Sequence, residues 1–277
     1  MDQRADLHLH TTASDGALSP TKMVESAATI GLSGIAITDH DTVDGIEEAL
    51  RAGRKLDIDV IPGIEISSIY QDKIEVHILG YFVDHHNEVF VEKLKILKNA
   101  RWERGMKMVE RLNSAGIAIS FERVIEIAQG GAIGRPHIAR AMHEIGVVSS
   151  MDSAFGKYLQ YGGIGYVPRY KVTPSEAVQM ILDAGGVPGC AHVAKLKRDE
   201  LIVSLMSEGL RAVEVYHPDH GPASSRFYRK FAEKRELIVT GGSDAHCFKG
   251  DKHPGVGAVS VPYDVVEQLR NAVCKPD

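Results

Sequence analysis

The amino-acid sequence predicts an α/β fold built on a mostly parallel sheet, for which a closed barrel is a natural form. Short runs rich in β-branched residues alternate along the chain with segments that have a helical pattern. Metal-compatible side chains follow most of these short runs. The chain has 277 residues, of which 44% are hydrophobic, so it can bury a full core in one large domain or two small ones.

The first predicted strand is the short apolar run that leads into the segment DLHLHTTASDG. Six later segments continue the series, at residues 31–40 (GLSGIAITDH), 57–67 (DIDVIPGIEIS), 73–83 (KIEVHILGYFV), 185–192 (GGVPGCAH), 210–217 (LRAVEVYH) and 236–246 (ELIVTGGSDAH). β-branched and apolar residues favour pleated, buried segments of this length. These runs are therefore expected to be successive strands of one sheet.

Two segments between the strands carry signals for both ends of a helix. In residues 19–31, Ser19 is a candidate N-cap, Pro20 is the first helical position and Gly31 follows the end. The same order of signals recurs in residues 173–186, where it consists of Thr173, Pro174 and Gly185. Both segments are predicted to be helices that connect strands.

The alternation stops between about Phe90 and Tyr170, where helical patterns follow one another without an evident strand. Residues 90–170 are therefore expected to form an inserted helical subdomain that binds substrate, between the barrel segments 1–89 and 171–277. Its first part, Val91–Arg111, contains seven Lys/Arg and three Glu. A stripe of apolar residues runs through it, so the segment is predicted to be an amphipathic helix with a solvated basic face.

Charge and composition exclude several classes of protein. A formal net charge of −5 argues against a protein that coats nucleic acid electrostatically, but it leaves room for a local cationic pocket. No window approaches about 18 uninterrupted apolar residues, and the first residues have no signal or transit pattern, so a cytoplasmic protein without a membrane segment is expected. The three cysteines, Cys190, Cys247 and Cys274, have no CxxC spacing and are expected to be reduced thiols.

Metal-compatible side chains gather at or just after the ends of the predicted strands. They are His8, His10, Asp15, Asp39, His40, Glu65, His77, His192, Asp244 and His246. The carboxyl ends of parallel strands converge on one face, so these groups are expected to share a site. In an extended segment, His8 and His10 point to the same face and can coordinate together. A carboxylate such as Glu65 can bridge two cations and lower the pKa of a shared water enough to form hydroxide near neutral pH.

Simpler interpretations compete with some of these assignments. A single buried histidine is usually a hydrogen-bonded core residue, so the prediction rests on the joint occurrence of the group. Asp39 either orients His40 or caps the turn, and the sequence leaves both open. His85, His86 and His253 lie in polar runs and are expected to be solvated loop residues.

The sequence resembles the PHP (polymerase and histidinol phosphatase) superfamily of metal-dependent phosphoesterases. The motifs that carry the resemblance are DLHLHTTASDG, ITDHDT, PGIEIS, VHILGY, CAH and TGGSDAH, in the order of the family over nearly the whole chain. The resemblance implies a distorted seven-stranded (β/α) barrel that holds about three divalent metal ions. Mixed imidazole and carboxylate ligands suit Mn²⁺, Fe²⁺ or Zn²⁺.

By position, the resemblance implies a set of ligands for each metal. His8, His10, Glu65 and Asp244 would hold one ion, Glu65 would bridge to a second ion held by His77 and His192, and Asp15, His40 and His246 would hold the third. Asp15, His40 and Glu65 are therefore expected to be catalytic as well as metal-binding residues.

The insertion, with GRPHIARAM and YLQYGGIGYVP, resembles the subgroup that includes nucleoside 3′,5′-bisphosphate phosphatases and a related exonuclease that acts on short RNA. Arg135 is expected to bind a phosphate with its planar guanidinium and to assist catalysis, whereas the alternative is a surface arginine. The resemblance also implies phosphate or nucleotide contacts for Arg101 and Arg104. It implies phosphate binding or proton donation by His220, and the role of His217 is open.

The leading hypothesis is therefore a metal-dependent phosphoesterase in which a metal-bridging hydroxide attacks phosphorus in line. Its expected partners are a phosphorylated nucleotide or a short oligonucleotide, with no required protein partner. One alternative is an amidohydrolase-type metal hydrolase, although no lysine ends a predicted strand. The other is a non-catalytic, metal-stabilised binding or regulatory module, which would be expected to have lost ligands. A serine nucleophile has no support, because no Gly-x-Ser-x-Gly elbow occurs.

Overall fold

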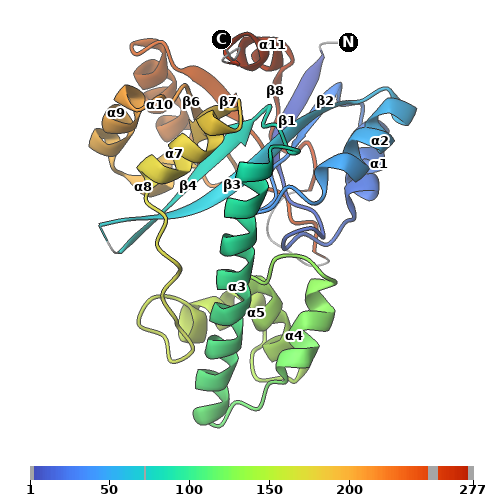
Figure 1. The fold of residues 1–277 in the computed structure, drawn as a ribbon, viewed down its shortest axis with the longest axis vertical. Coiled ribbons are helices and arrows are strands. Elements are labelled where there is room, and N and C mark those ends of the chain that lie inside the picture. The colour runs from blue at the N-terminus through green and yellow to red at the C-terminus, as the bar shows by residue number, and fades with distance from the viewer. Residues whose placement is uncertain (1–2, 72, 249–254, 274–277) are drawn as a thin grey trace.

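The computed structural model describes residues 3–71, 73–248 and 255–273 (Figure 1). Its eight-stranded sheet has the order β7-β6-β5-β4-β3-β2-β1-β8. The strands are β1 (Arg4–Leu9), β2 (Gly34–Ile37), β3 (Asp59–Tyr70), β4 (Ile74–Tyr81), β5 (Val187–Cys190), β6 (Ala212–Tyr216), β7 (Ile238–Gly241) and β8 (Val261–Pro262). His253 and Cys274, which figure in the expectations above, lie outside the described residues.

The strands run in two parallel groups separated by a reversed strand. β1, β2 and β3 are parallel neighbours, as are β5, β6 and β7. β4 is antiparallel to both β3 and β5, and the short β8 is antiparallel to β1. A parallel bridge between Leu9 and Ala245 joins the end of β1 to the segment after β7. The strands β1 to β7 therefore form a nearly closed, distorted barrel, which confirms the predicted fold class.

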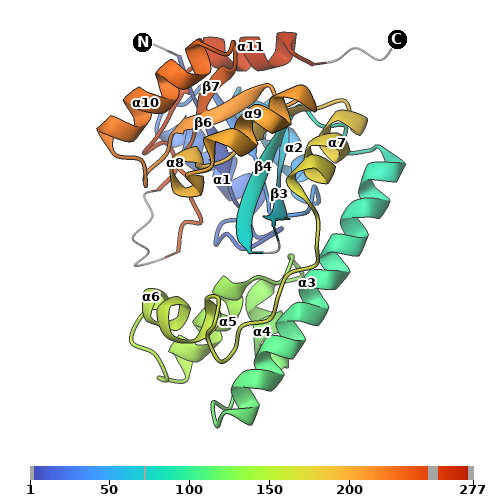
Figure 2. The same ribbon diagram turned by 90° about the vertical axis from the view of Figure 1, so that its left-hand side faces the viewer.

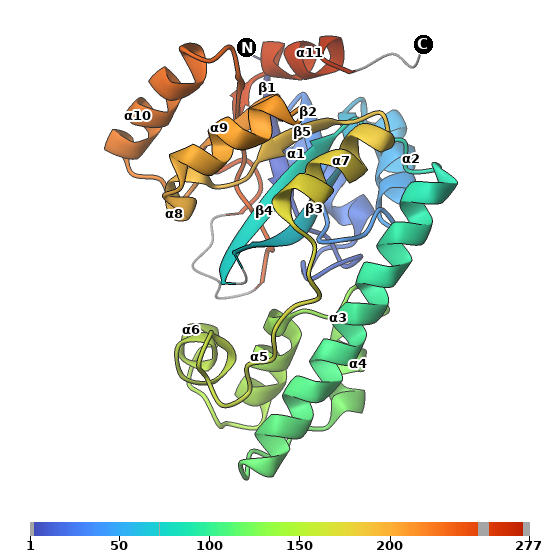
Figure 3. The same cartoon turned by 60° about the vertical axis from the view of Figure 1, so that its left-hand side comes forward.

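Helices cover the outside of the barrel (Figures 1 and 3). α1 (Pro20–Thr29) and α2 (Ile46–Leu56) lie beside the first strands. The later strands are accompanied by α7 (Pro174–Asp183), α8 (Val193–Leu196), α9 (Asp199–Ser207) and α10 (Pro222–Glu233). α11 (Asp264–Asn271) packs with Val266 and Leu269 against a core cluster that contains Leu7 of β1.

The predicted helix signals are confirmed at both ends of α1 and α7. The Ser19 hydroxyl accepts a hydrogen bond from the backbone amide of Lys22, and Thr173 caps α7 in the same way. Gly31 and Gly185 follow the two helices with φ of +79° and +72°. Glycine adopts this left-handed conformation without steric cost, so it ends each helix cleanly.

The part of the chain that follows β4 and precedes α7 forms a helical layer, which lies below the barrel in Figure 2. Its elements are α3 (Glu88–Ser114), α4 (Phe121–Ala128), α5 (Arg135–Glu144), α6 (Met151–Ala154) and the π-helical turn η1 (Phe155–Leu159). Every residue from 90 to 170 is described, and none of them lies in a strand. These elements share a hydrophobic cluster of their own, which includes Leu112, Ile138 and Leu159.

α3 belongs to both parts of the molecule. Phe90, Leu94 and Leu97 in its first half are buried in the barrel cluster that also contains Ile64. Met108, in its second half, packs in the cluster of the helical layer. The expected boundary at residue 90 therefore falls inside one continuous helix, which couples the two parts through its own backbone.

Two expectations from composition concern the whole described chain. No helix within residues 3–71, 73–248 and 255–273 combines the length and apolar character needed to cross a membrane. Cys190 is a free thiol, buried at the end of β5.

Candidate metal centre

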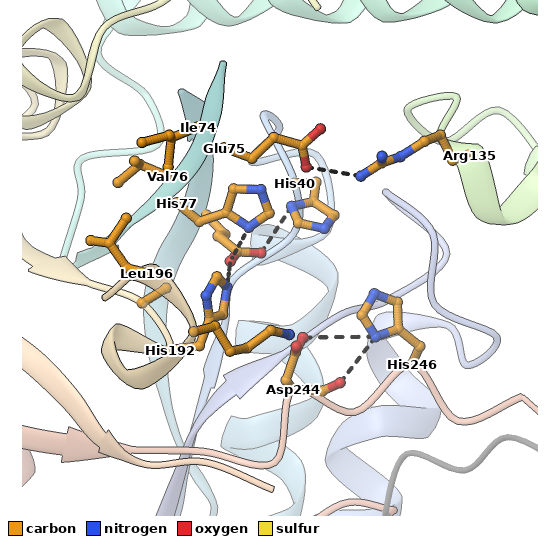
Figure 4. A pocket seen from close by; sticks show the side chains of 13 residues that line it. His40, Ile74, Glu75, Val76, His77, Arg135, His192, Leu196, Asp244 and His246 are labelled. Carbon is orange, nitrogen blue, oxygen red and sulfur yellow. Dashed lines mark hydrogen bonds and ion pairs between the residues drawn. The ribbon is translucent and has the colours of Figure 1, made fainter. Parts of the chain in front are cut away.

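The nine predicted ligands come together at one edge of the barrel. Figure 4 shows five of them, His40, His77, His192, Asp244 and His246. β1 and the loop after it supply His8, His10 and Asp15; the segments after β2, β5 and β7 supply His40, His192, Asp244 and His246; β3 and β4 supply Glu65 and His77. The convergence follows from the parallel arrangement of β1, β2, β5, β6 and β7, whose carboxyl ends lie at the same edge.

Glu65 and His77 reach this edge in a way that the sequence did not predict. Both were expected at strand ends, but Glu65 lies in the middle of the 12-residue β3 and His77 lies in the first half of β4. Because β4 runs opposite to its neighbours, its beginning meets the carboxyl edge of the parallel strands. The pairing of His77 with Ser67 of β3 places its imidazole beside Glu65.

The carboxylate of Glu65 is the centre of the cluster. Its Oε1 lies 2.8 Å from Nδ1 of His77 and 3.2 Å from Nε2 of His192. Its Oε2 lies 2.8 Å from Nδ1 of His40, and 3.5 and 3.4 Å from Nε2 of His8 and His10. The side chain is 1% exposed. Each oxygen of one buried carboxylate therefore faces a different set of imidazoles.

Asp244 provides a second carboxylate to the histidines of the first strand. Nε2 of His10 lies 3.0 Å from Oδ1 of Asp244, and Nε2 of His8 lies 3.5 Å from the same oxygen. Nε2 of His217 lies 3.2 Å from Oδ2. His217, whose role the sequence left open, thus contacts the other carboxylate oxygen of this predicted ligand.

A third group of side chains surrounds Asp15. Nε2 of His246 lies 3.3 Å from its Oδ1, and Nε2 of His40 lies 4.0 Å from its Oδ2. The His10 ring stacks on the His246 ring at a centroid distance of 4.3 Å. Donor atoms of His10, Asp15, His40 and His246 lie within 4.8 Å of one another, so they can share one cation.

Burial and charge act in opposite directions on the carboxylates. Burial alone would raise the pKa of Glu65, but the surrounding histidines, His40 foremost, hold it well below its usual range. Asp15 is buried too, and His40 and His246 hold its pKa well below the ordinary value. For His192 and His40, burial lowers the pKa, to about 4 for His40. Glu65 and Asp15 are therefore anionic and His40 and His192 are neutral, which are the forms that bind metal ions.

Two histidines of the cluster behave differently. Burial lowers the pKa of His8, but the charges of Glu214, Asp244 and Glu65 outweigh it and raise the pKa well above its ordinary value. His246 is the second. Burial lowers the pKa of His246, but the charge and hydrogen bond of Asp15 outweigh it and raise the pKa to about 10. A metal ligand must give up this proton, so binding of a cation at Asp15 and His246 is expected to release a proton.

Several buried polar atoms of the cluster have no hydrogen-bond partner within the part of the chain that the structure describes. They are Nε2 of His8, Nδ1 of His10 and Nε2 of His77. A buried polar atom without a partner costs free energy, so a convergent set of them indicates a ligand. Imidazole nitrogens mixed with carboxylate oxygens suit divalent transition metals. The residues present therefore fit such ions.

Glu214 is a residue that the sequence analysis missed. It is fully buried in β6 and accepts a hydrogen bond from Nδ1 of His8 at 2.8 Å. Its other oxygen accepts one from the backbone amide of His192 at 2.7 Å. The only signal in the sequence was a carboxylate between apolar residues of a predicted strand, in AVEVY.

The structure resolves the open question on Asp39. Its Oδ1 accepts hydrogen bonds from the backbone amide of Thr11 and the hydroxyl of Ser14, and its Oδ2 accepts one from the hydroxyl of Thr11. All of these donors lie in the loop after β1 that carries His10 and Asp15. Asp39 therefore braces this loop.

A cavity of about 270 Å³ opens beside the cluster. Arg135, at the start of α5, lines it together with Glu75 of β4 (Figure 4). Nη2 of Arg135 lies 2.9 Å from Oε2 of Glu75, and Nε of Arg169 lies 3.4 Å from Oε1. Arg169 was not singled out from the sequence. The helical layer thus presents two arginines to a single carboxylate beside the metal centre.

Arg101 and Arg104 do not form the solvated basic face that was predicted for α3. Each is 8% exposed. Arg101 forms an ion pair with Asp41 and donates a hydrogen bond from Nη2 to Ser67 at 2.8 Å, so it ties α3 to the barrel. Among the described residues, Arg101 is not one of those that line the cavity, and its contact with substrate stays a prediction.

Arg104 lies near Arg135, Arg169 and Glu75. Its Nε donates to the carbonyl of Val167 at 2.7 Å, and its buried Nη2 has no hydrogen-bond partner among residues 3–71, 73–248 and 255–273. Burial, followed by repulsion from Arg169 and Arg135, lowers its pKa to about 9. Arg104 is therefore a third cation near Arg135 and Arg169.

Both ring nitrogens of His220 contact backbone groups. Its Nδ1 donates to the carbonyl of Val215 at 2.8 Å, and its Nε2 accepts a hydrogen bond from the backbone amide of Ala194 at 3.3 Å. Both ring nitrogens are thus bound to backbone, and the ring does not line the cavity. His220 supports α8 through these bonds, and its phosphate contact or proton donation stays a prediction.

A smaller group lies away from the centre. Nε2 of His85 and of His86 lie 3.4 and 3.9 Å from Oε2 of Glu47. His86 is exposed as predicted, but the side chain of His85 is only 14% exposed, because it packs between Glu47 and the His86 ring.

Comparison with known proteins agrees with this geometry. The PHP domain family model matches residues 6–160, which is more than half of the chain. A crystal structure from Bifidobacterium adolescentis, described as that of a metal-dependent phosphoesterase, superposes with a TM-score of 0.91 at 32% identity. The match covers 99% of this chain and 97% of that chain.

Two characterised relatives match most of their own length. The 5′-3′ exoribonuclease Rnm of Escherichia coli is 36% identical over 252 residues, which cover 87% of this chain and 84% of the relative. The 3′,5′-nucleoside bisphosphate phosphatase of Chromobacterium violaceum is 31% identical over 277 residues, which cover 98% of this chain and 94% of the relative. The chain therefore belongs to the PHP domain family and is a metal-dependent phosphoric ester hydrolase.

Proposed function

We propose that this phosphoesterase hydrolyses phosphate esters of nucleotides that carry a second phosphate near the one that is cleaved. Nucleoside 3′,5′-bisphosphates and the 5′ ends of short RNA are substrates of this kind. One observation carries the proposal: the cavity beside the Glu65 cluster has an arginine of the helical layer on its other side (Figure 4). The names of the two relatives are consistent with it, since one is a bisphosphate phosphatase and the other an exoribonuclease.

The donor groups support about three divalent ions, of Mn²⁺, Fe²⁺ or Zn²⁺. In this assignment His8, His10, Glu65 and Asp244 hold the first ion, Glu65, His77 and His192 hold the second, and Asp15, His40 and His246 hold the third. A bridging role for Glu65 is supported by its two oxygens, because Oε1 faces His77 whereas Oε2 faces His8.

Bound divalent ions would supply a Lewis acid and a nucleophile derived from water near neutral pH. The chain itself positions the ligands. Glu214 fixes the ring of His8 through Nδ1, which directs Nε2 toward Glu65 and Asp244. Asp39 holds the loop that carries His10 and Asp15. Such outer contacts orient ligands and keep the site rigid.

A receptor for the second phosphate is needed because the metal ligands can position only the phosphoryl group that is cleaved. Arg135 and Arg169 provide paired guanidinium groups beside the cavity, and Arg104 adds a third positive charge behind them. Binding energy from a phosphate that does not react can orient the one that does. The segment 90–170, which carries all three arginines, is in this proposal the substrate-binding part of the enzyme.

The proposal is tested on protein purified without chelator. Elemental analysis is expected to find about three divalent ions per chain, and phosphate release should be fastest from nucleoside 3′,5′-bisphosphates or 5′-phosphorylated short RNA. Sugar phosphates serve as the comparison substrates and Glu65→Ala as the inactive control. A saturated stoichiometry near one ion would contradict the trinuclear site. A preference for sugar phosphates would contradict the nucleotide substrate.

A further inference from the structure

Lys195 is a cation in the catalytic cavity that neither the motifs nor the ligand sets account for. It lies on α8, three residues after His192, and lines the same cavity as Arg135. His192 and Leu196 of this segment lie on the side of the cavity away from Arg135 (Figure 4). The Nζ of Lys195 lies 2.8 Å from Oδ2 of Asp219, and its side chain is 48% exposed.

The backbone that carries Lys195 is held on both sides. His220 accepts a hydrogen bond from the amide of Ala194, and Glu214 accepts one from the amide of His192. Val193 between them is fully buried in the barrel core. The position of α8 is therefore fixed relative to the metal ligands, and the ammonium at the end of the Lys195 side chain contacts Asp219.

The surroundings keep Lys195 positively charged. Burial by itself would lower the pKa of its ammonium, but the hydrogen bond and charge of Asp219 raise it, and the carboxylates of Asp244 and Glu65 add to the effect. A cation at this place lines the same cavity as the predicted metal ligands His192 and Asp244. Arg135, by contrast, belongs to the side formed by the helical layer.

We propose that Lys195 is a further catalytic residue, which donates a hydrogen bond to a non-bridging oxygen of the phosphoryl group that is hydrolysed. This inference rests on the proposed function, because it requires a phosphate ester beside the metal ligands. Asp219 and the phosphoryl oxygens compete for the same ammonium, so the side chain turns from one to the other when substrate binds.

The role of Lys195 is electrostatic. During hydrolysis a P–O bond to a water oxygen forms and the ester P–O bond breaks, while the water loses a proton and the leaving oxygen gains one. Lys195 keeps its own proton throughout and stabilises the negative charge on the equatorial oxygens. The simpler interpretation is a surface ion pair with Asp219, which would contribute little to either stability or catalysis.

The test compares Lys195→Met and Lys195→Arg with the matched control Lys197→Met, an exposed lysine two residues further on. The substrates are a nucleoside 3′,5′-bisphosphate, p-nitrophenyl phosphate and methyl phosphate. Lys195→Met is expected to lower kcat/KM for all three by a similar factor, on the order of 10²-fold, as for loss of one donor to a transition-state oxyanion. Lys195→Arg should recover part of the rate, and Lys197→Met should leave it unchanged.

Two further measurements separate this role from others. Bound metal, measured by elemental analysis, should be the same in all variants, and calorimetry should show weaker binding of inorganic phosphate by Lys195→Met only. Rates and phosphate affinity equal to those of Lys197→Met would overturn the proposal. A loss confined to methyl phosphate would overturn it too, because a proton donor affects poor leaving groups most. If the wild type hydrolyses none of the esters, the proposed function fails, whereas the phosphate affinities still test Lys195.

Discussion

Oε1 of Glu214 lies 2.8 Å from Nδ1 of His8, and both side chains are completely buried. The hydrogen bond fixes the ring so that its Nε2 is directed at Glu65 and Asp244. The other carboxylate oxygen accepts the backbone amide of His192. One side chain on β6 therefore positions predicted ligands from β1 and from the segment after β5.

The first prediction concerns this contact. Glu214→Gln replaces an acceptor for two N–H groups by an amide that can accept through one atom only, so His8 or His192 loses its support. Affinity for Zn²⁺ is expected to fall about 10- to 100-fold, as measured by competition with a chelator. Glu233→Gln, at the end of α10, is the control. Equal affinities for the two variants would show that Glu214 has no such role.

The second prediction separates the bridging carboxylate from the rim ligands. Asp15→Ala or His246→Ala should reduce turnover much more than stability, because the remaining donor groups stay intact. Glu65→Ala removes the carboxylate at the centre and should impair metal loading itself. Metal content by elemental analysis and turnover are measured on the same samples. Equal metal content and equal residual activity in all three variants would contradict the assignments.

The third prediction concerns the receptor for the second phosphate. Arg135→Ala should lower kcat/KM for a nucleoside 3′,5′-bisphosphate by about 10²-fold, on the order of 2–3 kcal/mol for a lost charge-assisted contact. A small phosphate ester such as p-nitrophenyl phosphate should hardly be affected. An equal loss on both substrates would place Arg135 at the reacting phosphate, and no loss on either would leave it as the partner of Glu75 alone.

The fourth prediction is that Arg101 stabilises the fold. Arg101→Met leaves the carboxylate of Asp41 buried without its cation, and loss of one partner of a buried pair costs roughly 3–5 kcal/mol. The free energy of unfolding in urea measures this cost. Arg140→Met, at an exposed i,i+4 ion pair of α5, should change it by less than about 1 kcal/mol. Similar changes in unfolding free energy for the two variants would show that the pair of Arg101 with Asp41 does not stabilise the fold.

The fifth prediction is a dependence of stability on pH. Burial by itself raises the pKa of Glu75. The charges of Arg169 and Arg135 outweigh burial and hold this pKa below its ordinary value of 4.5. A carboxyl with a lower pKa in the folded state stabilises the protein above its unfolded pKa, and this contribution is lost as the pH falls. The difference in unfolding free energy between wild type and Glu75→Gln should therefore be constant at neutral pH and shrink below about pH 4.5. Urea denaturation across pH 3–7 measures it, and a difference that grows on acidification would contradict the assignment.

The sequence by itself was sufficient for the barrel and for the composition of the candidate metal centre. Strand and helix signals are local, as the Ser19 and Thr173 caps show. Convergence at the carboxyl edge follows from any parallel sheet, so residues that end strands far apart in the chain, such as His40 and His192, could be assigned to one site. The resemblance to a family added the expected grouping of the ligands.

Only the tertiary structure decided which charged groups are already paired. Arg101 contacts Asp41 and His220 contacts backbone groups, and among the described residues neither lines the cavity. Lys195 lines the cavity and Arg169 contacts Glu75 at its edge, although neither residue belongs to one of the motifs. The reversal of β4 decided that His77 reaches the site from the start of its strand. The physical reason is that burial and pairing of a charge depend on the groups that distant segments place beside it, whereas strand periodicity and helix capping depend on neighbours in the chain.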